Sequence, residues 1–140
     1  MKVGRACIAG VVGTAAMTVL MLALPHVGLP RLAMGEMLGT FSALTVGYAG
    51  IGATVGWVIH GLFGVVLAVI YAGAVVGRLP GSPLMRGLVF GFLVFILAQL
   101  VFMPLVGVGF FSGGDLHMLL GNLLGHLVYG GLVGAVYGLP

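Results

Sequence analysis

Two histidines in long apolar stretches are the residues of this sequence best suited to chemistry. Ionisable side chains inside membrane-spanning segments are rare, and they often mark functional sites. His60 and His126 each open the same spaced pattern, H-x3-G-x6-Y, which continues through Gly64 and Tyr71 in one copy and through Gly130 and Tyr137 in the other. The matched spacing predicts that both imidazoles lie at the same depth and face other helices.

Such a pair supports two interpretations. In the first, both histidines are structural and hydrogen-bond to carbonyl groups or to the amides of Gln99 and Asn122 across helix contacts. In the second, His60 and His126 bind the iron of a haem b from opposite sides, with Asn122 and Gln99 in the same site. The other polar residues that we expect inside the bundle are Thr14, Thr18 and Thr54.

A copper site is a further alternative, because imidazole and thioether groups both suit copper. Quinone or lipid binding and proton handling also stay open. The chain has four histidines and eight methionines. Methionine also serves as flexible packing, which is the alternative role for its thioethers. The candidate ligands nearest to one membrane surface are His26, His117, Met17, Met21 and Met103.

Hydrolytic catalysis has little support in the sequence. Ser112, Asp115 and His117 lie close together, but their spacing does not require a catalytic triad, and an exposed polar turn explains them. The sequence contains no P-loop, dinucleotide fingerprint or zinc-protease motif. We therefore expect a protein that is not an enzyme.

The composition indicates that most of the surface of this chain is surrounded by lipid. Hydrophobic residues make up 61% of the 140 residues and charged residues only 5%, whereas soluble domains carry about 25% charged residues. A helical span needs about 20 mainly apolar residues. The sequence predicts an all-α membrane protein, a single bundle of four transmembrane helices, with spans at about 6–24, 52–76, 87–105 and 116–139.

The connection between the first two spans contains a further helical pattern. Within residues 31–48, apolar side chains recur at helical spacing, which predicts a short amphipathic helix in the membrane interface. An irregular apolar loop is the alternative. The residues that carry the pattern are Met34, Met37, Leu38, Phe41, Leu44 and Tyr48.

The four spans divide into two similar helical hairpins. Besides the repeated histidine pattern, Arg5 and Gly10 in the first span mirror Arg86 and Gly91 in the third. Repeats with an even number of spans share one orientation, so their pseudo-twofold axis runs along the membrane normal. A chance match in a glycine-rich sequence is the alternative.

Small residues predict where the helices touch. Hydrophobicity does not drive association between helices in lipid, so close backbone approach through small residues must contribute. Glycine recurs at every fourth position along parts of the second and fourth spans. The predicted packing positions are Gly10, Gly52, Gly56, Gly64, Gly130 and Gly134.

The basic residues predict the orientation. Lys2, Arg5, Arg78 and Arg86 fall on one side of a four-span protein, and Arg31 falls on the other. The positive-inside rule then places both termini in the cytoplasm of a prokaryotic inner membrane. The expected partners are the lipid bilayer and either a larger membrane complex or further copies of this chain. Five basic residues spread along the chain make no patch for nucleic acid.

Three runs of sequence resemble a known family. They are GVVGTAAMTVLMLALPHVGLP at 10–30, GWVIHGLFGVVLAVIYA at 56–72 and LLGHLVYGGLVGAVYG at 123–138. Together they resemble a family of small four-helix bacterial membrane proteins catalogued as a domain of unknown function. The resemblance covers nearly the whole chain and implies four spans in a prokaryotic inner membrane, but no activity. We therefore expect a non-enzymatic scaffold or accessory subunit, with binding of haem or copper as the alternative.

Overall fold

The protein is built from helices long enough to cross a bilayer. The computed structural model describes residues 1–31, 34–39 and 52–139, and all regular elements in these residues are helical. Four helical stretches are long and apolar enough to span a membrane, which confirms the predicted count. They are Val3–Val27, Gly52–Val75, Pro83–Leu105 and Leu116–Tyr137.

Capping side chains explain where two of these stretches begin. Helix α4 (Pro83–Leu97) starts four residues before the predicted position because the Ser82 hydroxyl accepts a hydrogen bond of 3.3 Å from the backbone N–H of Met85. Helix α6 (Leu116–Tyr137) starts after Asp115, whose carboxylate accepts a bond of 3.0 Å from the Met118 N–H. Asp115 therefore has a structural role at this helix end.

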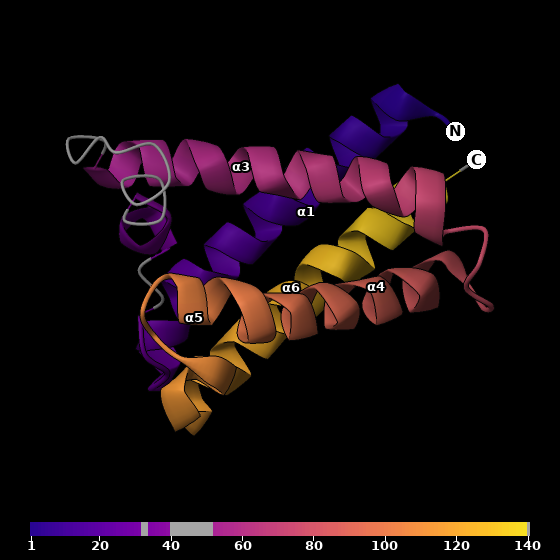
Figure 1. Ribbon diagram of the computed structural model, residues 1–140. Helices are drawn as coiled ribbons and strands as arrows, with labels where there is room; N and C mark the ends of the chain where they lie inside the picture. Colours follow the sequence, from indigo (N-terminus) through magenta and orange to yellow (C-terminus); the bar gives the residue numbers. More distant parts are fainter. Residues whose placement is uncertain (32–33, 40–51, 140) are drawn as a thin grey trace.

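The helices form two pairs that meet at the centre. Helix α1 (Val3–Ala23) packs against α3 (Gly52–Ile70) and against α6, and α6 in turn packs against α4. The order across the molecule is therefore α3, α1, α6, α4. Figure 1 shows α3 and α4 in front of α1 and α6, with both termini at the same end as the connection between α3 and α4.

Glycines allow close contact within each pair. A Cβ atom added to Gly10 of α1 would lie 2.8 Å from the Cα of Val65, next to the carbonyl of Gly64 on α3. In the second pair, a Cβ on Gly91 of α4 would clash with the backbone at His126 and Gly130 of α6. Both pairs thus touch through their backbones, the kind of contact that small residues permit in lipid.

The other predicted packing glycines differ in their surroundings. A Cβ on Gly134 would meet the backbone of Pro83 and Gly87, at the α4–α6 contact. Gly56 lies against the backbone of Gly35 and therefore packs on the short helix 34–39 and not on another span. Gly52 departs from the prediction, because a Cβ there would meet nothing within 4 Å. Its φ of +56° favours glycine for a backbone reason at the start of α3.

The described part of the predicted interfacial segment is the helix at 34–39. Met34 and Leu38 of this helix are buried against the core of the bundle. Residues 32–33 and 40–48 of the predicted segment lie outside the described residues. Met34 and Leu38 also line the cavity described below.

Two of the spans change helical geometry near one end. Helix α3 continues as the π-helical turn η2 (Tyr71–Val75), and α4 continues as the π-helical turn η3 (Ala98–Phe102) before α5 (Met103–Leu105). Wide turns of this type occur frequently at functional sites. The turn η3 contributes directly to the cavity described below.

The connection between α5 and α6 contains a buried polar contact. Ser112 lies in the left-handed turn η4 (Phe110–Gly114), is only 2% exposed, and donates a hydrogen bond of 3.0 Å to the side-chain oxygen of Gln99. The prediction of an exposed polar turn is therefore wrong for Ser112. It holds for Asp115 and His117, both of which are exposed. Thr54 is also exposed, contrary to its predicted place inside the bundle.

Candidate functional site

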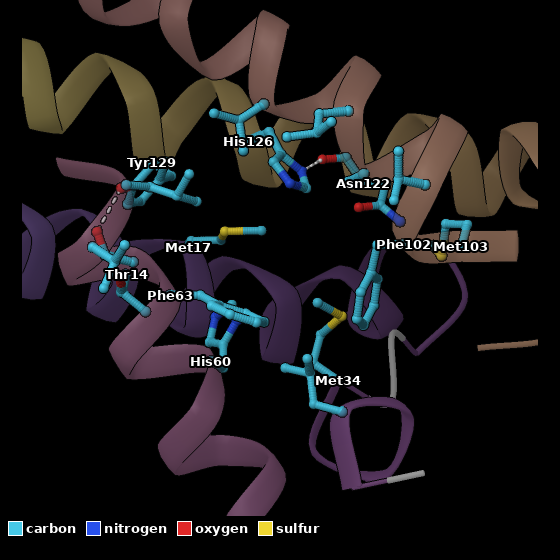
Figure 2. Close-up of a pocket in the computed structure, with 18 of the residues that line it drawn as sticks. Thr14, Met17, Met34, His60, Phe63, Phe102, Met103, Asn122, His126 and Tyr129 are labelled. Atoms are coloured by element: carbon cyan, nitrogen blue, oxygen red, sulfur yellow. Dashed lines mark hydrogen bonds between the residues drawn. The ribbon is translucent and has the colours of Figure 1, made fainter. Parts of the chain in front are cut away.

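A cavity of about 420 Å³ lies between α3 and α4, with α1 and α6 forming its floor. Figure 2 shows the side chains of His60 and His126 pointing into this space from α3 and α6. Most of the walls are apolar. The residues of the lining that carry polar atoms or sulfur are Thr14, Met17, Met34, His60, Met103, Asn122, His126 and Tyr129.

One hydrogen bond defines the chemistry of the His126 ring. Its Nδ1 lies 2.8 Å from the backbone carbonyl oxygen of Asn122, one helical turn earlier (Figure 2). A carbonyl only accepts, so Nδ1 carries the proton and donates. This tautomer leaves the lone pair on Nε2, which is the form of imidazole that accepts a hydrogen bond or binds a metal.

Two other polar atoms of the site have no hydrogen-bond partner among the described residues. They are Nε2 of His60 and Nδ2 of Asn122, and both are buried. His60 is 8% exposed and packs its ring edge-on to Trp57, with 5.8 Å between centroids, while Asn122 is 1% exposed. A buried polar group without a partner costs about 1–3 kcal/mol, so a bound polar group would be favoured here.

The hydroxyl groups of the lining are already satisfied. Thr14 donates to the carbonyl of Gly10 at 2.8 Å, and Tyr129 donates to the carbonyl of Gly64 at 2.6 Å. The first bond lies within α1, and the second joins α6 to α3. The polar atoms that remain for a ligand therefore belong to His60, Asn122 and His126.

The cavity opens sideways, toward the hydrocarbon of the bilayer. Several of its lining residues are also among the exposed apolar residues of the outer surface. They include Phe63 and Val66 on α3, and on the other side Leu97 at the end of α4 and Val101 in the turn η3. These residues form the mouth. Since they lie within the spans, a ligand would enter from the lipid phase.

The structure brings together only part of the predicted site. His60, His126 and Asn122 line one cavity with Met17 and Met103. Gln99 does not line it, because its side chain is fully buried and holds Ser112 instead. Sequence reasoning could not anticipate this contact, since Ser112 reaches Gln99 only through a left-handed turn.

The predicted metal ligands are likewise not gathered. His26 and His117 are exposed, and the Nδ1 atom of His117 lies 4.0 Å from the Asp115 carboxylate. Met21 is buried in the core and does not line the cavity. Across the part of the chain that the structure describes, no three His, Cys, Asp or Glu residues are placed to hold a metal ion.

Several lining residues were not predicted. Tyr129 lies one helical turn after His126, so the helical period alone points to it. Met34 carries the apolar pattern of the segment before α3, yet only the fold brings it to the cavity. Phe63 and Phe102 have no sequence signal that separates them from other lipid-facing aromatic residues.

The chain was compared with characterised proteins, with solved structures and with protein families. Neither the curated proteins nor the solved structures give a match. The family comparison gives one match, which extends over residues 1–139 and therefore over all four spans. The matching family is described as a family of unknown function (DUF6789), and the chain belongs to it.

Proposed function

We propose that this membrane protein is not an enzyme and binds a small, mostly apolar molecule that enters its cavity from the bilayer. The observation that carries the proposal is the pair of unpartnered buried polar atoms, His60 Nε2 and Asn122 Nδ2, in a cavity that opens between lipid-facing helices. Its volume of about 420 Å³ falls in the range of about 300–1,000 Å³ that is usual for small-molecule sites.

The donor and acceptor atoms of the cavity indicate which polar groups a ligand should carry. Asn122 Nδ2 is an unpartnered donor that an oxygen acceptor would satisfy. His126 Nε2 offers an acceptor, because the proton of this ring is on Nδ1. An isoprenoid quinone and its quinol fit this set, because their ring oxygens accept in the oxidised form and also donate in the reduced form. The apolar walls would hold the ring, and the tail would leave through the mouth.

The wider role that we propose is that of an accessory or scaffold subunit in a larger membrane complex or homo-oligomer. The orientation that we propose places both termini in the cytoplasm of a prokaryotic inner membrane. It is supported by the basic residues: Lys2 and Arg5 lie at the start of α1, and Arg78 and Arg86 lie in the α3–α4 connection and the first turn of α4. This connection is at the same end of the molecule as the termini (Figure 1). The equivalent Gly10–Gly64 and Gly91–Gly130 contacts support duplication of one ancestral hairpin.

Haem b is the second candidate ligand. It is favoured by the presence of both histidines in one cavity and by the free lone pair on His126 Nε2. A copper ion held by the same histidines with Met17 and Met103 is a variant of this idea. Neither ligand would satisfy the Asn122 amide donor, which is why the quinone class fits better.

Trp57 provides a direct test. It is the only tryptophan of the chain and lies against the His60 ring, so a quinone in the cavity should quench its fluorescence. The purified protein in mild detergent would be titrated with a short-tailed quinone and, separately, with an alkylbenzene of equal size that lacks the oxygens. We expect saturable quenching by the quinone and competition by its quinol.

Matched variants give the test its specificity. Asn122→Leu should weaken quinone binding about five- to tenfold, which corresponds to one hydrogen bond of about 1–1.4 kcal/mol. His117→Leu, which alters an exposed histidine outside the cavity, should leave binding unchanged. Quenching that rises linearly without saturation would contradict the proposal. A Soret band in protein from haem-supplied cells, lost in both His60→Ala and His126→Ala, would favour haem.

A further inference from the structure

The His126 ring is held in one orientation. Its Nδ1 donates to the backbone carbonyl of Asn122 at 2.8 Å, within its own helix, and Phe95 of α4 packs edge-on against the ring with 6.1 Å between centroids. The side chain is 7% exposed and points into the cavity (Figure 2). The proton on Nδ1 is therefore already used, and Nε2 is the ring nitrogen left for a ligand.

The His126 ring is uncharged in this site. An imidazolium buried among apolar side chains needs a nearby counter-ion. The sequence has only two side-chain carboxylates, and both lie outside the four spans: Asp115 caps the start of α6, and Glu36 pairs with Arg31 at 3.5 Å. A neutral ring with its proton on Nδ1 has no hydrogen on Nε2, so this atom can only accept a hydrogen bond.

The other two polar side chains that face a ligand lack this restriction. Asn122 donates through Nδ2, and the oxygen of a quinone carbonyl or of a quinol hydroxyl would accept from it equally well. No hydrogen bond from a described residue fixes the proton of His60, so its unpartnered Nε2 can donate to a carbonyl or accept from a hydroxyl. Among these three side chains, His126 alone distinguishes a ligand with a donor from one without.

We propose that the cavity binds a quinol, the reduced form of the carrier, more tightly than the quinone. The inference rests on the proposed function and specifies the redox state of its ligand. A quinol hydroxyl would donate to His126 Nε2, whereas a quinone has only acceptor oxygens and would leave this buried acceptor without a partner, at a cost in free energy. A tenfold preference for the quinol would raise the reduction potential of the bound two-electron couple by about 30 mV.

The test compares three ligands of similar size on the purified full chain in mild detergent, without oxygen. They are a short-tailed quinone, its quinol and the dimethyl ether of that quinol, which keeps both oxygens but has no hydroxyl proton. Each is titrated by calorimetry, with protein-free micelles as the blank. We expect the quinol to bind about five- to tenfold more tightly than the quinone or the ether.

The outcomes separate this inference from the proposed function. If quinone binds as tightly as quinol, or if the ether does, the preference for the reduced form is wrong and the proposed function still stands. If none of the three ligands binds, the proposed function itself is wrong, and the inference fails with it.

Variants of the two histidines locate the discrimination. His126→Leu removes the acceptor, so it should weaken quinol binding about fivefold, leave quinone binding nearly unchanged and abolish the preference. His60→Leu is the matched control, which should weaken both forms alike and keep the preference. Nitrogen NMR of histidine-labelled protein reads the tautomer without a ligand. A proton on Nε2 of His126 in place of Nδ1, or a quinol preference that survives His126→Leu, would overturn the inference.

Discussion

The Tyr129 hydroxyl donates a hydrogen bond of 2.6 Å to the backbone carbonyl of Gly64, and this bond joins α6 to α3 beside the cavity. The two helices belong to different hairpins, so the contact ties the halves of the molecule together. Tyr129 is 3% exposed, and the bond is therefore shielded from competing water.

Removal of this bond should lower stability. Tyr129→Phe keeps the ring and should reduce the free energy of unfolding by about 0.5–1.5 kcal/mol. The measurement is unfolding in mixed detergent micelles, followed by circular dichroism. Tyr137→Phe is the control, since its hydroxyl only accepts the longer and exposed bond from Lys2. An equal loss in the two variants would show that the Gly64 contact contributes nothing special.

Gly91 should tolerate no side chain. A Cβ at this position would run into the backbone of α6 at His126, so Gly91→Ala must push α4 and α6 apart, at a cost of about 1–3 kcal/mol. Gly61→Ala is the matched control in the middle of α3, where a Cβ meets nothing within 4 Å. It should be neutral or slightly stabilising, because alanine favours helix more than glycine does. The same unfolding measurement distinguishes them.

Gly64 and Thr14 should behave as a coupled pair. A Cβ on Gly64 would overlap the Thr14 side chain, so Gly64→Ala should destabilise the α1–α3 contact. Thr14→Ala removes the hydroxyl and methyl that cause the overlap and should restore part of the loss. A double-mutant cycle then gives a coupling energy of about 0.5–3 kcal/mol. Additive effects of the two substitutions would contradict the packing described here.

The buried contact between Ser112 and Gln99 should matter more than its place in a connecting turn suggests. Ser112→Ala leaves the amide oxygen of Gln99 without its donor and should cost about 1–3 kcal/mol. The double variant with Gln99→Leu removes both partners and should cost less than the sum of the single changes. If the two losses simply add, the hydrogen bond is not the source of the effect.

The proposed orientation can be checked by labelling in intact cells. In a Cys7→Ala background, which removes the only cysteine, a cysteine replacing Arg31 should react with an impermeant maleimide from outside. A cysteine replacing Arg78 should react only after the membrane is opened. Both arginines are exposed, so access from the correct side is the only variable. The reverse pattern would invert the topology.

The sequence predicted the spans because the length of an apolar run is a property of the chain alone. The start of α4 differs by four residues from the prediction, since it depends on the capping side chain of Ser82, whereas α6 begins at Leu116 as predicted. Gly52 illustrates a second limit. A glycine in a row of small residues predicts a close helix contact. At Gly52 a Cβ would meet nothing within 4 Å, and glycine is favoured there because the φ angle is positive.

The site was predicted only in part. The helical period and the repeated spacing identified His60 and His126, and Asn122 followed from its position one turn before His126. The exclusion of Gln99 depends on Ser112 in a left-handed turn, and the mouth depends on the separation of α3 and α4 by the two central helices. Both are products of tertiary packing, which no local pattern encodes.

The order of the four helices also determines when during synthesis the cavity becomes complete. Helices α1 and α3 emerge from the ribosome first and supply Thr14, Met17 and His60, whereas Asn122 and His126 arrive on the last helix of the chain. A nascent chain that ends before α6 therefore lacks Asn122, Tyr129 and one of the two histidines of the cavity. Ligand binding would then act as a late checkpoint of biogenesis, because it stabilises only chains that have inserted all four helices.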